Sequence, residues 1–487
     1  MNPTRPLVFV FLALTVAARA DVALPKIFGD HLVLQREIAA PIWGHAAPGE
    51  NVTVRFAAQE KHATASADGR WRVQLDPLPA SAEPRDLTVA GANTIVLHDT
   101  VVGEVWLCSG QSNMEMAVGV TSAGAAPESA HDPAVAEEIK TASYPAIRLF
   151  RVEKKLQPPD VVSAGWTECR GDALARFSAA GFFFGRAVQQ NLGVPVGLIE
   201  SSWGGSRIEE WISDEAYAKL EKILGADAER CFERDARLVS RDYDGMIAPL
   251  APFALRGVLW YQGESNIIAY NDGMRYADKF AVLVANWRAA WERPDLPFYS
   301  VQLAPYLYTQ RKDKLAHGDD ELPKLWEAQL ATAAIPNTGI VPIADTVDEV
   351  RNIHPGKKSV VGQRLASLAL ARVYHRTDAP ASGPIFSRAE FTAGRAVVHF
   401  AHAEGGLATS DGKAPAGFEL AGADGHFTPA TAEIRGDTVL LSANEVPSPQ
   451  LVRFAWHETA RVTLVNRAGW PAYPFRNDAP AWKASAK

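Results

Sequence analysis

The 487-residue chain is poor in cysteine, with only Cys108, Cys169 and Cys231. At most one disulfide can form, so disulfide bonds do not define the fold. We expect Cys108, which follows the apolar stretch Val105-Trp106-Leu107, to pack as a small buried side chain. Basic residues are not in excess either: Lys and Arg number 49, Asp and Glu number 56, and the net charge is −7. This balance argues against a nucleic-acid partner.

Long hydrophobic runs are also absent after the first 20 residues, so no later segment is predicted to span a bilayer. The first 20 residues contain Arg5, the apolar run Leu7–Ala18, and small residues at Ala18 and Ala20. This pattern predicts a secretory signal peptide over residues 1–20. The alternative, a transmembrane anchor, would need about 20 apolar residues. We therefore expect a secreted or periplasmic protein with no membrane association after cleavage.

The composition itself is ordinary for a globular protein, with 47% hydrophobic and 22% charged residues. It excludes disorder, a collagen helix and a coiled coil as the main content of the chain. At about 100–200 residues per domain, the length corresponds to two to four domains.

Two parts of the sequence are typical of antiparallel β-structure. Residues 21–100 contain short alternating runs, such as Val52–Phe56 and Trp71–Leu75, separated by turns rich in Pro, Gly and Asp. A Pro- and Gly-containing linker over residues 378–384 is followed by further runs of this kind, such as Ala396–Phe400. We predict an N-terminal β domain over residues 21–100 and a C-terminal β region over residues 378–487, both resembling β-sandwiches.

Residues 101–377 instead alternate apolar strands with helical patterns, which is typical of βαβ units. The predicted strands are Gly103–Ser109, Val194–Ser201, Gly257–Gln262, Phe298–Leu303 and Gly339–Ala344. The predicted helices are Ala179–Asn191, Met274–Trp291, Lys324–Ile335 and Lys357–Tyr374. These elements predict a three-layer α/β domain with a parallel sheet, whose ligands bind beyond the carboxyl ends of the strands.

Polar or glycine-rich turns follow several of these strands. Ser112 lies in a turn after the first strand, where a nucleophile would be exposed near backbone N–H donors. The surrounding pattern differs from Gly-x-Ser-x-Gly, so the nucleophile elbow of the α/β-hydrolases is absent. Gly204 and Gly205, after the second strand, either donate N–H groups to an oxyanion or only form a tight turn.

Two further strand ends carry several polar groups. Gln262, Glu264 and Asn266 crowd one turn after the third strand, where three unlike polar groups suggest a site. His354 lies in a loop after the last strand, with acidic neighbours. A histidine in this loop can reach a nucleophile at the same sheet edge and act as a general base.

Taken together, these motifs resemble the sialate O-acetylesterase family of SGNH-type carbohydrate esterases. The matching segments are Trp106-Leu-Cys-Ser-Gly-Gln-Ser-Asn-Met-Glu-Met116, Trp203-Gly-Gly205, Tyr243-Asp-Gly-Met-Ile-Ala-Pro-Leu250, Trp260-Tyr-Gln-Gly-Glu-Ser-Asn266 and Ile353-His-Pro355. The opening β region resembles the family too, in Ile27-Phe-Gly-Asp-His-Leu-Val-Leu-Gln-Arg36 and Pro48-Gly-Glu-Asn-Val-Thr-Val54. The resemblance therefore extends over most of the chain.

The resemblance implies a serine esterase that removes O-acetyl groups from carbohydrates, with Ser112 as nucleophile and His354 as base. It also implies that Gly205 and the Gln262 side chain hold the oxyanion. The acid that supports the histidine is open, because the family's usual aspartate position, three residues before the histidine, is Arg351 here. Glu264 is the first candidate, Asp345 and Asp348 are alternatives, and a Ser-His dyad is possible.

Substrate contacts and substrate class are less determined. Trp203 and Asn266 are candidate substrate-binding residues, and Arg207 could bind a sugar carboxylate or pair with Glu209 or Glu210. The substrate is either an acetylated sialic acid or an acetylated plant polysaccharide such as xylan or xyloglucan. No metal or cofactor is expected, because no cluster of ligand residues with suitable spacing is present. The alternatives to an enzyme are a non-catalytic carbohydrate-binding protein and a structural surface protein.

Overall fold

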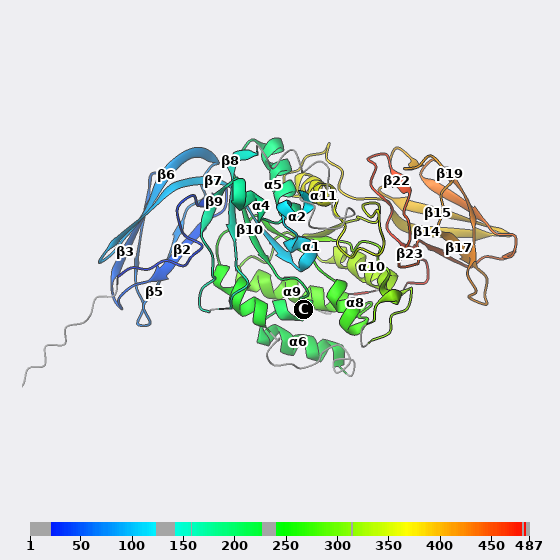
Figure 1. The fold of residues 1–487 in the computed structure, drawn as a ribbon, viewed down its shortest axis with the longest axis horizontal. Helices are drawn as coiled ribbons and strands as arrows, with labels where there is room; N and C mark the ends of the chain where they lie inside the picture. Colours follow the sequence, from blue (N-terminus) through cyan, green and yellow to red (C-terminus); the bar gives the residue numbers. More distant parts are fainter. Residues whose placement is uncertain are drawn as a thin grey trace, which may run out of the picture.

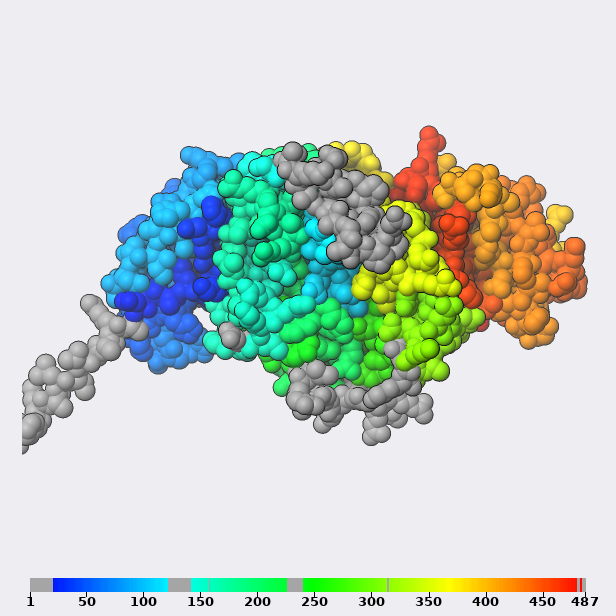
Figure 2. All heavy atoms as spheres, viewed as in Figure 1, coloured from blue at the N-terminus to red at the C-terminus, as the bar shows by residue number. Residues whose placement is uncertain are grey.

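The computed structural model describes residues 21–122, 142–156, 158–225, 240–312, 315–479 and 482–483. The predicted signal peptide, residues 1–20, and Cys231 lie outside the described residues. A β-rich N-terminal region, a central α/β region and a C-terminal β region follow one another along the long axis (Figures 1 and 2). Within the described ranges, no helix has both the length and the apolar character that crossing a membrane requires.

The central sheet has seven strands in the order β13-β12-β11-β7-β10-β8-β9. All neighbours are parallel except β8 and β9, so the sheet is mixed. The strands are β7 (Thr94–Gly110), β8 (Ser143–Arg151), β9 (Trp166–Arg170), β10 (Val196–Ser202), β11 (Gly257–Tyr261), β12 (Phe298–Val301) and β13 (Thr338–Val341). Each of the five predicted strands corresponds to one of these, while β8 and β9 were not predicted.

Helices cover both faces of this sheet, with α5 and α11 above it and α6 and α9 below it in Figure 1. The longer helices are α5 (Ala179–Leu192), α6 (Asp214–Leu224), α8 (Glu264–Tyr270), α9 (Arg275–Ala290), α10 (Glu321–Ala331) and α11 (Lys358–Arg372). Shorter helices are α1 (Ser112–Glu115), α2 (Val118–Ser122) and α4 (Gly171–Ala175). All four predicted helices are confirmed, and α5 has the end signals expected for a helix. The Ser178 side chain accepts the Gly181 N–H at its start, and Gly193 ends it with φ +67°.

The strand β7 belongs to two regions of the molecule. Its first half pairs with β6 (Ser81–Ala90) and its middle with β1 (Val33–Gln35), whereas its second half lies between β10 and β11. The predicted boundary at residue 100 therefore falls inside one continuous strand. The other N-terminal strands are β2 (Ala40–His45), β3 (Asn51–Phe56), β4 (Gln59–Thr64) and β5 (Arg70–Leu75), in antiparallel pairs.

The C-terminal region contains two four-stranded antiparallel sheets and a two-stranded pair. The first sheet contains β14 (Ile385–Thr392), β15 (Arg395–Ala401), β19 (Thr431–Arg435) and β20 (Thr438–Ser442). The second contains β17 (Phe418–Ala421), β18 (Thr428–Pro429), β21 (Leu451–Phe454) and β23 (Phe475–Arg476). The pair is formed by β16 (Leu407–Thr409) and β22 (Leu464–Asn466). Apolar side chains from both sheets share one core, which includes Val398, Leu420 and Phe454.

Candidate active site

The strands β7, β10 and β11 end at the same edge of the central sheet, and the turns after them approach one another there. Gly110, at the end of β7, has φ +136°, and a Cβ at this position would lie 2.2 Å from the Tyr261 carbonyl oxygen of β11. Only glycine tolerates both this backbone conformation and this close approach. The chain can therefore turn at once into α1, which places Ser112 at the sheet edge.

Ser112 and His354 are brought together although 242 positions separate them in the sequence. The His354 Nε2 lies 2.8 Å from the Ser112 Oγ, and the His354 backbone N–H donates to Asn352 Oδ1 over 3.0 Å. Burial and the nearby Lys358 ammonium lower the pKa of His354, while Glu115 acts in the opposite direction. The lowered pKa favours a neutral imidazole near pH 7, which can accept the serine proton.

None of the three candidate acids contacts the histidine ring. Glu264 is buried, and its Oε1 accepts a hydrogen bond from Asn113 Nδ2 over 2.5 Å, while its Oε2 has no partner. Asp345 forms a bidentate pair with Arg364, and Asp348 pairs with Lys357. Within the part of the chain that the structure describes, no carboxylate lies within ion-pair distance of the His354 ring. The geometry is therefore that of a Ser-His pair without an adjacent acid.

The two candidate oxyanion glycines differ in their surroundings. The Gly204 N–H already donates to Glu115 Oε2 over 2.6 Å, and a Cβ at Gly204 would lie 3.3 Å from the Ser112 Cβ. Gly205 is exposed with φ +81°, and its N–H has no hydrogen-bond partner among the described residues. Of the two, Gly205 has the N–H without a hydrogen-bond partner among the described residues, and it lies one residue beyond the glycine that approaches Ser112.

Gln262 directly follows β11 and Asn266 lies in the first turn of α8, and both side chains are buried. The Gln262 amide donates to the Ser206 carbonyl oxygen and to Asn266 Oδ1, and both side chains are fully buried. Asn266 Nδ2 donates to Asp272 and Glu209, which also pair with the buried Lys279. In this structure the donors of both side chains are occupied by buried partners, and the roles of Gln262 in holding the oxyanion and of Asn266 in binding substrate stay predictions. Both side chains serve a buried polar network, because their donors are already used there.

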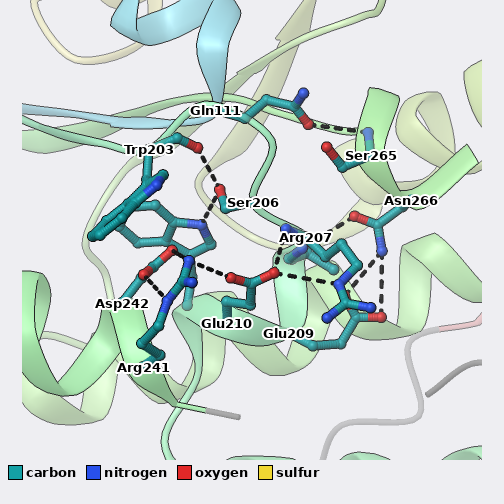
Figure 3. Close-up of polar contacts among 12 residues, drawn as sticks. Gln111, Trp203, Ser206, Arg207, Glu209, Glu210, Arg241, Asp242, Ser265 and Asn266 are labelled. Atoms are coloured by element: carbon teal, nitrogen blue, oxygen red, sulfur yellow. Dashed lines mark hydrogen bonds and ion pairs between the residues drawn. The ribbon is translucent and has the colours of Figure 1, made fainter. Parts of the chain in front are cut away.

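Trp203 and Arg207 lie in a second polar cluster beside the glycine turn (Figure 3). The Arg241 guanidinium carbon lies 4.6 Å from the centre of the Trp203 ring, and Arg207 and Arg241 converge on the Glu210 carboxylate. Of the two alternatives for Arg207, the structure therefore shows the pair with Glu210. The Trp203 ring is partly exposed, with one face covered by an arginine.

Three residues with close contacts at this edge were not singled out from the sequence. Asn113 and Lys358 are buried and bonded to each other, and Glu115 accepts the Gly204 N–H. Asn113 and Glu115 belong to the motif around Ser112, which was the one available signal for them. Nothing in the sequence distinguishes Lys358 from its partly exposed neighbour Lys357.

Cys108 lies in β7, the strand that leads to Ser112. Cys108 is buried as expected, and burial raises the pKa of its thiol, which disfavours the nucleophilic thiolate. Among the residues with described positions, no group of three or more His, Cys, Asp or Glu side chains could hold a metal ion.

A comparison with protein families matches residues 102–371 to a model described as carbohydrate esterase, sialic acid-specific acetylesterase. This range covers more than half of the chain and includes both Ser112 and His354.

Individual relatives agree with this match. The sialate O-acetylesterases of Homo sapiens and Pongo abelii are each 31% identical over 414 residues, which cover 77% of this chain and 75% of the relative. The solved structure of a carbohydrate acetylesterase from Xanthomonas citri is 33% identical with a TM-score of 0.82. That alignment covers 94% of this chain and all of the other. The similarity therefore extends beyond the central α/β region.

Proposed function

Because the chain belongs to the sialic acid-specific acetylesterase family of carbohydrate esterases, and is thus a carbohydrate O-acetylesterase, we propose that it works as a serine esterase through Ser112 and His354. The observation that carries this proposal is the 2.8 Å contact between Ser112 Oγ and His354 Nε2 at the sheet edge. A serine and a neutral histidine at this distance form the minimal pair for nucleophilic acyl transfer.

In the first half-reaction, His354 Nε2 removes the proton from Ser112 Oγ as this oxygen attacks the acetyl carbonyl carbon. The ester bond to the sugar breaks, and the sugar oxygen takes the proton from His354, which leaves an acetyl-Ser112 intermediate. In the second half-reaction, His354 deprotonates a water molecule that attacks the acetyl carbonyl. Acetate leaves, and the proton returns to Ser112.

The negative charge that develops on the carbonyl oxygen needs donors beside Ser112. The Gly205 N–H is the available candidate, since the Gly204 N–H donates to Glu115 and the Gln262 amide donates to buried partners. Removing one such donor typically costs about 2.7–4 kcal/mol in the activation barrier. Glu264 does not reach the histidine ring, so we propose a Ser-His dyad for the proton transfers.

The substrate is proposed to be an O-acetylated sugar. The family description and the human relative name sialic acid, while the relative from Xanthomonas citri is named only as a carbohydrate acetylesterase. Acetylated sialic acid and acetylated plant polysaccharides are therefore both candidates. We also propose that the central region has an SGNH-type arrangement. The proposed domain limits are residues 100 and 377, and residues 1–20 are proposed to direct export.

The test compares acetate release by the wild-type protein and Ser112→Ala. The substrates are acetylated sialic acid, acetyl-xylan, acetyl-xyloglucan and an aryl acetate. We expect Ser112→Ala to lower kcat by roughly 10⁴-fold or more, because no other group replaces the nucleophile. Ser387→Ala, an exposed serine on β14 in the C-terminal region, serves as the matched control and should retain wild-type activity.

Two results would contradict the proposal. Activity of Ser112→Ala equal to that of the control would show that Ser112 is not the nucleophile. If the wild-type protein released no acetate from any of these esters, the esterase proposal would be rejected. A non-catalytic carbohydrate-binding protein would then be favoured, and sugar-binding measurements would test it.

A further inference from the structure

A lysine is buried directly behind the proposed catalytic pair. Lys358 begins α11, four residues after His354, and its side chain is fully buried. Within the described ranges of the chain, no carboxylate lies within ion-pair distance of its ammonium group. Burial lowers the pKa of Lys358 to about 7, while Glu264 acts in the opposite direction. Burying a lysine without a paired carboxylate disfavours folding. Hydrogen bonds to other groups must therefore compensate for the burial of Lys358.

The Lys358 ammonium donates to two acceptors, Asn113 Oδ1 over 2.6 Å and the Pro355 carbonyl oxygen over 2.7 Å. The Asn113 amide nitrogen in turn donates to the Ile353 carbonyl oxygen over 3.0 Å and to Glu264 over 2.5 Å. Because the Ile353 carbonyl oxygen can only accept, the Asn113 nitrogen must face it, and the Asn113 oxygen then faces Lys358. Asn113 has no freedom to rotate without losing these bonds.

These hydrogen bonds hold the backbone on both sides of His354. The carbonyl before the histidine, that of Ile353, is held by Asn113, and the carbonyl after it, that of Pro355, is held by Lys358. Asn113 is also the residue that follows Ser112 in α1. One buried pair of side chains thus joins the peptide groups on both sides of the histidine to the helix of the nucleophile.

We propose that Lys358 is a positioning residue for the esterase reaction, which together with Asn113 holds the His354 loop so that the imidazole stays within reach of Ser112. The proposal rests on the proposed function of Ser112 and His354. Lys358 does not touch the reacting atoms: its ammonium group contacts the loop and Asn113. Its effect on catalysis comes from the geometry and electrostatics of the histidine.

The electrostatic part of this role involves the charged groups that act on His354 and Lys358 among the described residues. His354 faces Glu115 from α1 and Lys358 from α11, and Lys358 faces Glu264 from α8 and the ring of Tyr261, 5.2 Å away. Lys358 and burial lower the pKa of His354, whereas Glu115 raises it. Removing the Lys358 charge therefore leaves burial and Glu115, and the pKa of His354 rises.

The experiment compares Lys358→Met with Lys357→Met in the full chain, using an aryl acetate as the probe. Lys357 is the adjacent lysine, but it is partly exposed and pairs with Asp348, so it is a matched control. We expect Lys358→Met to lower kcat by about 10²-fold with KM nearly unchanged, since a small displacement of a catalytic group has effects of this size. Lys357→Met should stay within about twofold of wild type, as expected for an exposed ion pair.

The pH profile separates this role from a general loss of structure. We expect the acid limb of kcat/KM, which reports the base in the free enzyme, to move to higher pH in Lys358→Met and not in Lys357→Met. Lys358→Gln, which is neutral but keeps a donor, is measured alongside in case the methionine variant does not fold. It should show the same shift of the acid limb with a smaller loss of kcat.

The proposal fails if the lysine 358 variants keep the wild-type kcat and acid limb, or if kcat falls and KM rises together with no shift of the limb. The wild-type and Ser112→Ala proteins in the same assay keep the two proposals apart. An active wild type, an inactive Ser112→Ala and wild-type-like lysine 358 variants would overturn only the role of Lys358. An inactive wild type would overturn the serine mechanism first.

Discussion

At the scale of single residues, the surroundings of His354 set its readiness to accept a proton. Its side chain is partly buried and it feels the positive charge of Lys358, and both influences disfavour the charged imidazolium. The Glu115 carboxylate opposes them, but it is bound by Lys154 and the Gly204 N–H. An ester hydrolase of this kind needs a neutral imidazole, and these neighbours favour that form.

The pH dependence of the wild-type reaction follows from this. Because the pKa of His354 is lowered from its ordinary value of 6.5, the base is still unprotonated somewhat below that pH. We expect kcat/KM to fall on the acid side with a midpoint below pH 6.5 as His354 gains its proton. Initial rates with an aryl acetate across pH 4–9 check this, and an acid-limb midpoint above pH 7 would contradict it.

At the scale of elements, the helices α5 and α11 pack closely against each other on one face of the central sheet. Gly362 of α11 faces α5, where a Cβ would lie 2.6 Å from the Phe183 Cβ and 2.7 Å from the Ala180 carbonyl oxygen. Such distances leave no room for a methyl group, and the neighbouring atoms include backbone that cannot move alone. Since α11 begins at Lys358, this contact also supports the element that follows the His354 loop.

The substitution Gly362→Ala tests this contact. In an exposed helix the change from glycine to alanine stabilises by about 1 kcal/mol. At this position we expect the opposite sign, a destabilisation of about 1–3 kcal/mol from overpacking. Thermal unfolding followed by circular dichroism provides the measurement, with Gln363→Ala, an exposed position on the same helix, as control. An unchanged or higher Tm for Gly362→Ala would show that α5 and α11 can move apart enough to accommodate the added methyl group without loss of stability.

At the scale of the whole molecule, the described residues form two hydrophobic cores. One core extends from the N-terminal strands into the central region and includes both Leu87 and Trp106. The two regions share this core because β7 runs through both of them. The other lies within the C-terminal sheets and includes Leu441. We therefore expect the proposed catalytic pair to depend on the N-terminal strands more directly than on the C-terminal ones.

This division predicts different results for two matched core substitutions. Leu87→Ala and Leu441→Ala each remove a fully buried leucine, a change that typically costs about 2–5 kcal/mol. We expect two calorimetric transitions, with Leu87→Ala lowering the one at which esterase activity is lost and Leu441→Ala lowering the other. Residual activity after heating, measured beside calorimetry, checks this. Equal effects of both variants on the inactivation temperature would indicate a single cooperative unit.

The fold could be predicted where a repeating pattern is long and apolar. The helices α5, α9, α10 and α11 and the strands β7, β10, β11, β12 and β13 could be predicted because buried parallel strands and amphipathic helices differ clearly in period. The strands β8 and β9, at one end of the sheet, were not predicted, since β8 begins with the partly polar Ser-Tyr-Pro and pairs with β9 across an irregular register. Pairing of this kind depends on neighbours distant in the sequence.

The amino-acid order by itself determined which residues could meet at one sheet edge, because the turns carrying Ser112, Gly205 and His354 each follow one of the parallel strands of the central sheet. It also determined the family, through motifs that extend over most of the chain. Only the tertiary structure decided how each polar side chain is used. It buried Gln262 and Asn266 in a network with Lys279, and it directed Glu264 to Asn113. These choices depend on which donors and acceptors meet after packing, and a single sequence does not record such distances.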